Sequence, residues 1–111
     1  MSQRPEIALD EEQQQARSWF EGLRDRICGA FEAIEREAGS DARFGFTPWD
    51  REGGGGGARG LIKGRVFEKA GVNVSTVGGS FAPEFAKTIH GAAEDPRFFA
   101  TGISLVAHMA N

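Results

Sequence analysis

The first third of the chain has apolar residues spaced three and four positions apart. They fall at Ala16, Trp19, Phe20, Leu23, Ile27, Phe31, Ile34 and Ala38. This spacing places them on one face of a helix. Asp10 followed by Gln13 resembles a capping box, and Gly39 with Ser40 ends the pattern. The sequence therefore predicts an amphipathic helix over residues 11–38, which must pack on another element to be stable.

Beyond residue 41 the pattern changes to alternation with period two, which predicts strands. Residues 42–51 look extended, and Pro48 places this strand at a sheet edge because proline cannot donate a ladder hydrogen bond. Residues 59–67 predict a hairpin that turns at Lys63–Gly64, followed by a bend at Ala70–Gly71 and a strand over 72–77. Pro83 suits the first turn of a short helix.

Residues 101–109 predict the last strand, with two different faces. Ile103, Leu105, Ala107 and Met109 form an apolar face that we expect to join the core. Ser104 and His108 lie on the other face, about 13 Å apart along the strand. The predicted fold class is α+β: a long N-terminal amphipathic helix packed on part of a large antiparallel β-sheet.

Five consecutive glycines, residues 53–57, interrupt the alternation. No Lys-Ser/Thr pair follows at the spacing of a phosphate-binding loop, and no helical pattern opens behind the run as in a dinucleotide-binding turn. Two interpretations remain open. The run is either a flexible linker or a loop whose backbone must approach another group closely, such as an anion.

Composition narrows the classes of function. The chain has 111 residues, 40% of them hydrophobic, and a net charge of −3, which argues against general nucleic-acid binding. No apolar run approaches the roughly 20 residues of a membrane-spanning helix, and the N-terminus lacks a signal peptide, so we expect a cytoplasmic protein. Cys28 is the only cysteine, and its place beside the apolar stripe indicates a buried, inert thiol rather than a nucleophile.

Polar residues that could bind or react are few. Arg59, Lys63, Arg65 and Lys69 form a basic group whose default interpretation is a solvated surface, with carboxylate binding as the minority alternative. His108 is a single imidazole, which cannot form a metal site alone. Spacing assembles no Ser/His/Asp constellation. The residue pattern by itself therefore indicates no reaction.

Three motifs resemble one family. Residues 49–60 (Trp-Asp-Arg-Glu, five glycines, Ala-Arg-Gly), residues 66–75 (Val-Phe-Glu-Lys-Ala-Gly-Val-Asn-Val-Ser) and residues 102–108 (Gly-Ile-Ser-Leu-Val-Ala-His) occur in this order. They are similar to the N-terminal signature and the next block of oxygen-dependent coproporphyrinogen III oxidases. The resemblance identifies residues 10–111 as the N-terminal part of a single domain of this kind, truncated at its C-terminus. The residue pattern predicts a disordered or loosely packed tail over residues 1–9.

The resemblance implies a homodimeric enzyme with a large antiparallel sheet flanked by helices. It implies oxidative decarboxylation of the ring A and ring B propionates of coproporphyrinogen III to the vinyl groups of protoporphyrinogen IX, in heme biosynthesis. Molecular oxygen is then the oxidant, and no organic cofactor is used. The alternative function, of another class, is a non-catalytic porphyrin- or protein-binding module that retains only this part of the fold.

The resemblance also assigns roles to two residues of the last strand. Ser104 matches a serine that contacts substrate, and His108 matches a histidine assigned as a divalent-metal ligand in bacterial members. The family's proton donor and its remaining metal and carboxylate-binding residues fall beyond Asn111, so we expect no catalytic residue within residues 1–111.

Overall fold

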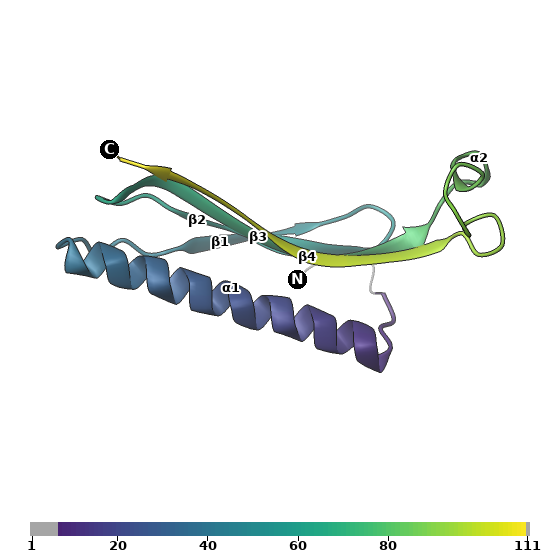
Figure 1. Ribbon diagram of the computed structural model, residues 1–111, viewed down its shortest axis with the longest axis horizontal. Coiled ribbons are helices and arrows are strands. Elements are labelled where there is room, and N and C mark those ends of the chain that lie inside the picture. Colours follow the sequence, from purple (N-terminus) through teal and green to yellow (C-terminus); the bar gives the residue numbers. More distant parts are fainter. Residues whose placement is uncertain (1–6, 111) are drawn as a thin grey trace.

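A computed structural model describes residues 7–110 of the chain. The elements, in order, are α1 (Glu11–Glu37), β1 (Gly45–Asp50), β2 (Gly55–Ile62), β3 (Phe67–Ser80), α2 (Pro83–Ala86) and β4 (Arg97–Met109). The strands form one antiparallel sheet in the order β1-β2-β3-β4, with α1 along one face (Figure 1). The predicted α+β class, with a long helix on an antiparallel sheet, is confirmed. Most of the tail predicted over residues 1–9 lies outside the described residues.

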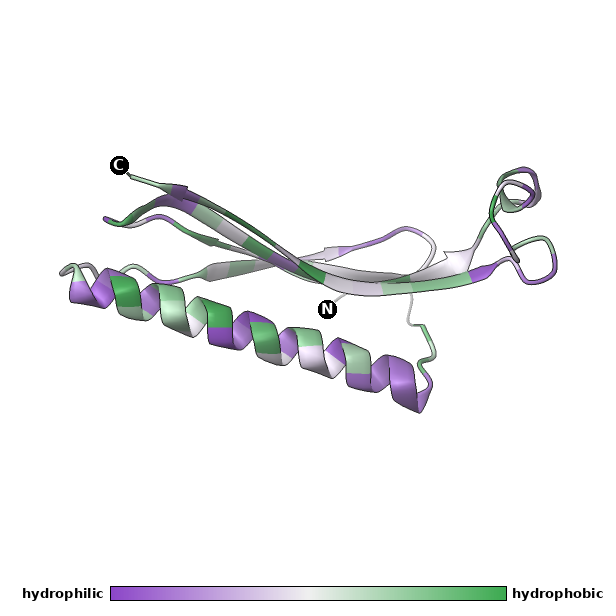
Figure 2. Ribbon diagram, in the orientation of Figure 1, coloured by the Kyte–Doolittle hydropathy of each residue, from purple (hydrophilic) through white to green (hydrophobic). Residues whose placement is uncertain are grey.

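Helix α1 begins at the predicted capping box. The backbone N–H of Gln13 donates to Asp10 Oδ1 at 2.8 Å, and the Asp10 N–H donates to Gln13 Oε1 at 3.1 Å. Hydrophobic and hydrophilic residues alternate along α1 (Figure 2), and the helix packs on β3 and β4 with Ile27, Cys28 and Phe31 at the core. Coverage is incomplete, because Trp19 and Ile34 remain 59% and 42% exposed.

The core lies between the second half of α1 and the part of the sheet next to the β2–β3 hairpin. Ile62, Ala70 and Val72 are at most 1% exposed there, and Phe31 of α1 stacks on Phe67 of β3 with ring centroids 4.4 Å apart. Ile103 of β4 packs against this cluster.

The predicted apolar face of β4 lies on the expected side of the sheet, but its residues are less buried than a core face would be. Ile103 and Leu105 pair with the buried Val74 and Val72, so the predicted apolar row does lie on the α1 side. Leu105 and Met109 are nevertheless 43% and 52% exposed. The reason is position: β4 is an edge strand of the described sheet, so neighbours cover it from one side only.

The glycine run is neither a linker nor a loop along its whole length. Gly53, Gly54 and Gly55 have positive φ values of 101°, 141° and 85°, which make the turn between β1 and β2. From Gly55 onward the run is paired with β3 inside β2. A Cβ atom on Gly57 would overlap the backbone oxygen of Val74 and lie 2.9 Å from Trp49 Cζ2. Close approach, the second interpretation, explains these glycines, but the neighbours are strand backbone and an indole ring.

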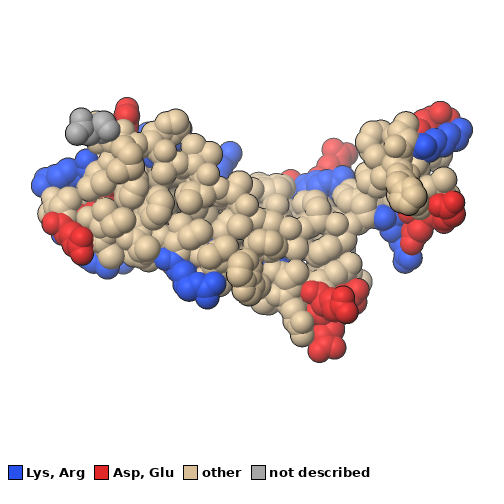
Figure 3. Space-filling model, in the orientation of Figure 1, with Lys and Arg blue, Asp and Glu red and all other residues tan. Residues whose placement is uncertain are grey.

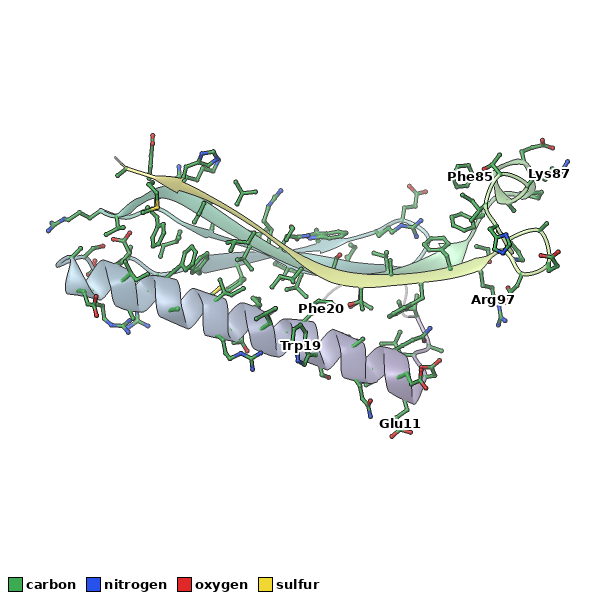
Figure 4. All side chains as sticks on the ribbon, in the orientation of Figure 1. Glu11, Trp19, Phe20, Phe85, Lys87 and Arg97 are labelled. Carbon is green, nitrogen blue, oxygen red and sulfur yellow. The ribbon has the colours of Figure 1, made fainter. Side chains whose placement is uncertain are left out.

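Two other details differ from the prediction. The bulge lies between Phe67 and Lys69 rather than at Ala70–Gly71, and β3 runs without a break to Ser80. Strand β4 begins at Arg97, four residues earlier than predicted. The extra residues form a two-stranded arm that ends at α2, where Phe85 projects outward (Figure 4) and is 53% exposed. These additions make the molecule elongated, 56 × 27 × 25 Å.

Candidate functional site

The sheet has one face against α1 and one face that no element of the described chain covers (Figure 1). Ser104 is opposite Asn73 and His108 is opposite Lys69 in the β3–β4 register. Directly opposite residues of an antiparallel pair share a face, and this face is the one away from α1. We call it the open face. The structure therefore places Ser104 and His108 on one face, both exposed, as the alternation of the last strand predicts.

A polar row crosses the open face from β1 to β4. Thr47 pairs with Arg59, Arg59 with Asn73, and Asn73 with Ser104. The neighbouring row begins at Trp49, whose indole Nε1–H donates to Asn73 Oδ1 at 2.9 Å. Ser104 is thus the last member of a row to which all four strands contribute.

The open face carries positive charge. Arg59 and Lys69 project from β2 and β3, and Arg51 lies over the Phe98 ring with its guanidinium 5.1 Å from the ring centroid. The paired strand positions of this face, within residues 7–110, include no Asp or Glu. Such a surface suits carboxylate ligands, for which arginine is a strong and directional partner. Figure 3 shows charged side chains of both signs at the end of the molecule that carries α2, and an acidic group at the lower edge where α1 begins.

The four basic residues singled out in the sequence do not act as one group. Arg65 donates from its Nη1 to the Ala38 carbonyl oxygen at 3.0 Å and so ties the β2–β3 hairpin to the end of α1. Lys63 is exposed at the tip of that hairpin. Arg59 and Lys69 alone belong to paired strand positions of the open face.

The donor set around His108 does not make a metal site. Its strand partner is the ammonium-bearing Lys69, and residues 7–110 contain no group of three or more His, Cys, Asp or Glu side chains that could hold an ion. A protein metal site needs three or four such ligands. A metal at His108 would require ligands from outside the described residues, so the metal role of His108 stays a prediction.

Glu35 is a polar centre that the sequence analysis did not single out. Its side chain is fully buried, and its carboxylate accepts the backbone N–H groups of Arg65 at 2.8 Å, Val66 at 3.0 Å and Phe67 at 2.8 Å. Burial by itself raises the pKa of this carboxyl. Hydrogen bonds from the Phe67 and Arg65 backbone, the Ser40 side chain and the Val66 backbone outweigh it, and the pKa is lowered.

The spacing of residues along α1 could have identified Glu35 as a buried residue. Glu35 follows Cys28 and Phe31 at steps of three and four, so it shares their face of α1. A second carboxylate one turn earlier acts in the same way, because Glu32 Oε2 accepts the backbone N–H of Phe44 at 2.9 Å. These carboxylates hold the β2–β3 hairpin and the entry to β1 against the helix, and so fix the strands that carry the open face.

A groove of about 470 Å³ lies on the other side of the sheet, between the first half of α1 and the glycine run. Arg17, Glu21 and Arg24 line it from the helix. Arg17 Nε lies 3.5 Å from Glu21 Oε2, and the Arg24 guanidinium packs 5.4 Å from the centroid of the Phe46 ring. These groups are therefore already partnered, and Ser104 and His108 do not reach this groove.

The fold and the open face together define an α+β protein with an uncovered sheet face that carries arginine and lysine side chains. Comparison with known proteins then narrows the class. The sequence profile of the family described as coproporphyrinogen III oxidase matches residues 15–111. The chain belongs to the coproporphyrinogen III oxidase family.

Individual relatives agree with the family assignment. The chain is 56% identical over 99 residues to a protein of Rickettsia felis, and 55% identical over 97 residues to one of Rickettsia rickettsii (strain Sheila Smith). Both relatives are named oxygen-dependent coproporphyrinogen-III oxidase. The alignments cover 85% and 83% of this chain but 36% and 35% of the relatives, so the chain spans about a third of their length. Within the described residues, no helix is long and apolar enough to cross a membrane.

Proposed function

We propose that the protein containing this chain is an oxygen-dependent coproporphyrinogen III oxidase. It converts the propionates on rings A and B of coproporphyrinogen III to the vinyl groups of protoporphyrinogen IX. Each conversion releases CO₂ and a hydride equivalent, whose two electrons pass to molecular oxygen. The observation that carries the proposal is family membership over residues 15–111, together with relatives of the same name at 52–56% identity.

The open face is this chain's contribution to substrate binding. Coproporphyrinogen III bears four carboxylates, and the open face presents Arg59 and Lys69 at its paired strand positions, with the exposed Glu68 in the bulge beside Lys69. Ser104 ends the row of hydrogen-bonding groups that contains Arg59 and Asn73. We assign Ser104 to substrate contact, with its hydroxyl donating to a carboxylate. The proton donor and the remaining ligand-binding groups come from parts of the protein outside this chain.

Oxygen supplies the oxidising power in this proposal, and no organic cofactor is required. His108 keeps its assignment as a ligand of a divalent metal, completed by groups outside this chain. The protein is expected to be cytoplasmic and homodimeric. Exposed apolar residues on α1 and β4, including Trp19, Leu105 and Met109, offer surface that a larger assembly would cover. Light scattering coupled to size-exclusion chromatography measures the oligomeric state.

The decisive experiment incubates the purified protein with coproporphyrinogen III under air. Protoporphyrin fluorescence after oxidation, CO₂ release and oxygen uptake report the reaction. We expect two CO₂ for each molecule of substrate, and no product without oxygen. Tight binding of porphyrinogen with no CO₂ release would support the non-catalytic binding module instead.

A matched pair of variants tests the assignment of Ser104. Ser104→Ala removes one hydrogen bond to a charged ligand, so we expect kcat/KM to fall roughly 10- to 100-fold. Ser18→Ala removes an exposed hydroxyl from α1 on the other side of the sheet, and we expect no change. Equal kcat/KM for both variants would contradict the role of Ser104.

A further inference from the structure

Asn73 occupies the centre of the polar row on the open face, one strand from Arg59 and one strand from Ser104. Neighbouring strands lie about 4.8 Å apart, so Arg59 and Ser104 are roughly 10 Å apart across the sheet, with Asn73 between them. A carboxylate group placed over Asn73 is thus within reach of a guanidinium on one side and a hydroxyl on the other. The long arginine side chain covers most of that distance.

The Trp49 indole fixes which end of the Asn73 amide is available. Indole Nε1–H can only donate, so the atom that it meets at 2.9 Å is the amide oxygen of Asn73. The Asn73 Nδ2 group is thereby left with its two N–H donors for another partner. Both side chains are half-buried, and Trp49 lies close over Gly57, which limits the movement of the ring.

The Arg59 side chain has no polar partner among the described residues. Its side chain is exposed, and within residues 7–110 it forms no ion pair or hydrogen bond. The rows on either side contain Gly57 and Gly71, which have no side chains to obstruct approach to the polar row. Arg65 on the same hairpin differs, since its guanidinium is already bound to the Ala38 carbonyl oxygen.

We propose that Arg59, Asn73 and Ser104 form a carboxylate-binding row that holds one propionate of the substrate, with Trp49 as a positioning residue. Arg59 supplies the charge-assisted hydrogen bond, and Asn73 and Ser104 supply neutral donors. Trp49 acts through Asn73 by keeping its amide nitrogen turned outward. This inference rests on the proposed function and adds to it the residues that recognise the anionic group.

Steady-state kinetics of the whole protein with coproporphyrinogen III tests the row. We expect Arg59→Gln to raise KM roughly 10- to 100-fold. We expect the KM of Arg59→Lys to lie between those of Arg59→Gln and the wild type, because lysine keeps the positive charge but lacks the planar guanidinium that forms two parallel hydrogen bonds with a carboxylate. The control is Arg26→Gln, which removes one exposed charge from α1 on the covered side of the sheet and leaves KM unchanged. Added salt raises KM for the wild type more steeply than for Arg59→Gln.

A double-mutant cycle tests the role of Trp49. Trp49→Phe keeps a ring over Gly57 but removes the N–H donor, and we expect KM to rise several-fold with kcat unchanged. In an Asn73→Ala background the same change has no further effect on KM, because the amide that it positions is gone. An equal effect of Trp49→Phe in both backgrounds would show a purely structural role and overturn the positioning assignment.

The outcomes separate the two proposals. A wild-type protein without turnover refutes the oxidase function. A wild-type protein that turns over, with Arg59→Gln within twofold of its KM and an unchanged melting temperature, refutes the carboxylate-binding row and leaves the oxidase function intact.

Discussion

Substitution of Gly57 by alanine tests why the first residues of β2 are glycines. A methyl group there has no free volume, because the Cβ would overlap the Val74 carbonyl oxygen and approach Trp49 Cζ2 to 2.9 Å. The first obstacle is strand backbone, which cannot rotate away as a side chain can. Overpacking of this kind costs about 1–3 kcal/mol. We therefore expect Gly57→Ala to destabilise the protein, although alanine restricts the unfolded chain more than glycine does.

Gly102→Ala serves as the matched control. Gly102 belongs to β4, has no positive φ, and has no atom within 4 Å of an added Cβ. Both substitutions change the unfolded chain by the same amount, so the difference between them isolates the clash, about 1–3 kcal/mol. Each kcal/mol corresponds to a change in Tm on the order of 2–4 °C. Differential scanning calorimetry of both variants measures the difference. Equal melting temperatures would refute the close-packing explanation of the glycine run.

Two further predictions concern buried groups of α1. The pKa of Glu35 is lowered from 4.5 in the folded state, so its stabilisation is complete above that pH and is lost as the pH falls through the lower folded value. Urea unfolding from pH 7 to pH 3 should show a steeper loss of stability for the wild type than for Glu35→Gln; parallel curves would contradict this. Burial raises the pKa of Cys28 to about 11, so it should resist Ellman's reagent at pH 8 until the protein is unfolded, and a native-state rate equal to that of free thiol would disprove its burial.

Local patterns predicted the elements that carry a clear period. Helix α1, its capping box at Asp10, the edge strand with Pro48 and the short helix after Pro83 all occur as predicted, because each depends on residues close in the sequence. The start of β2 could not be predicted in this way. Glycines have no side chains, so residues 53–57 show neither period, and only the pairing with β1 and β3 reveals that Gly55–Gly57 belong to a strand.

The candidate site likewise combines features that local sequence predicts with features that depend on residues far apart in the sequence. Alternation along the last strand was enough to place Ser104 and His108 on one face. The partners of Ser104 on that face depend on the register of separate strands, which pairs it with Asn73, 31 positions earlier in the sequence. Glu35 was missed because a charged residue is expected on the solvated side of a helix, whereas three backbone donors of the hairpin satisfy it in the interior.

The arm formed by the ends of β3 and β4 determines where local unfolding of the sheet can begin. Near its middle β3 is hydrogen-bonded on both sides, but beyond Val77 its partner is β4 alone. An isolated two-stranded ribbon is marginally stable in water. Stability is thus graded along the length of the sheet. Fluctuations that begin at α2 can fray the arm, and they stop where β2 first pairs with β3, before they reach the row that contains Ser104.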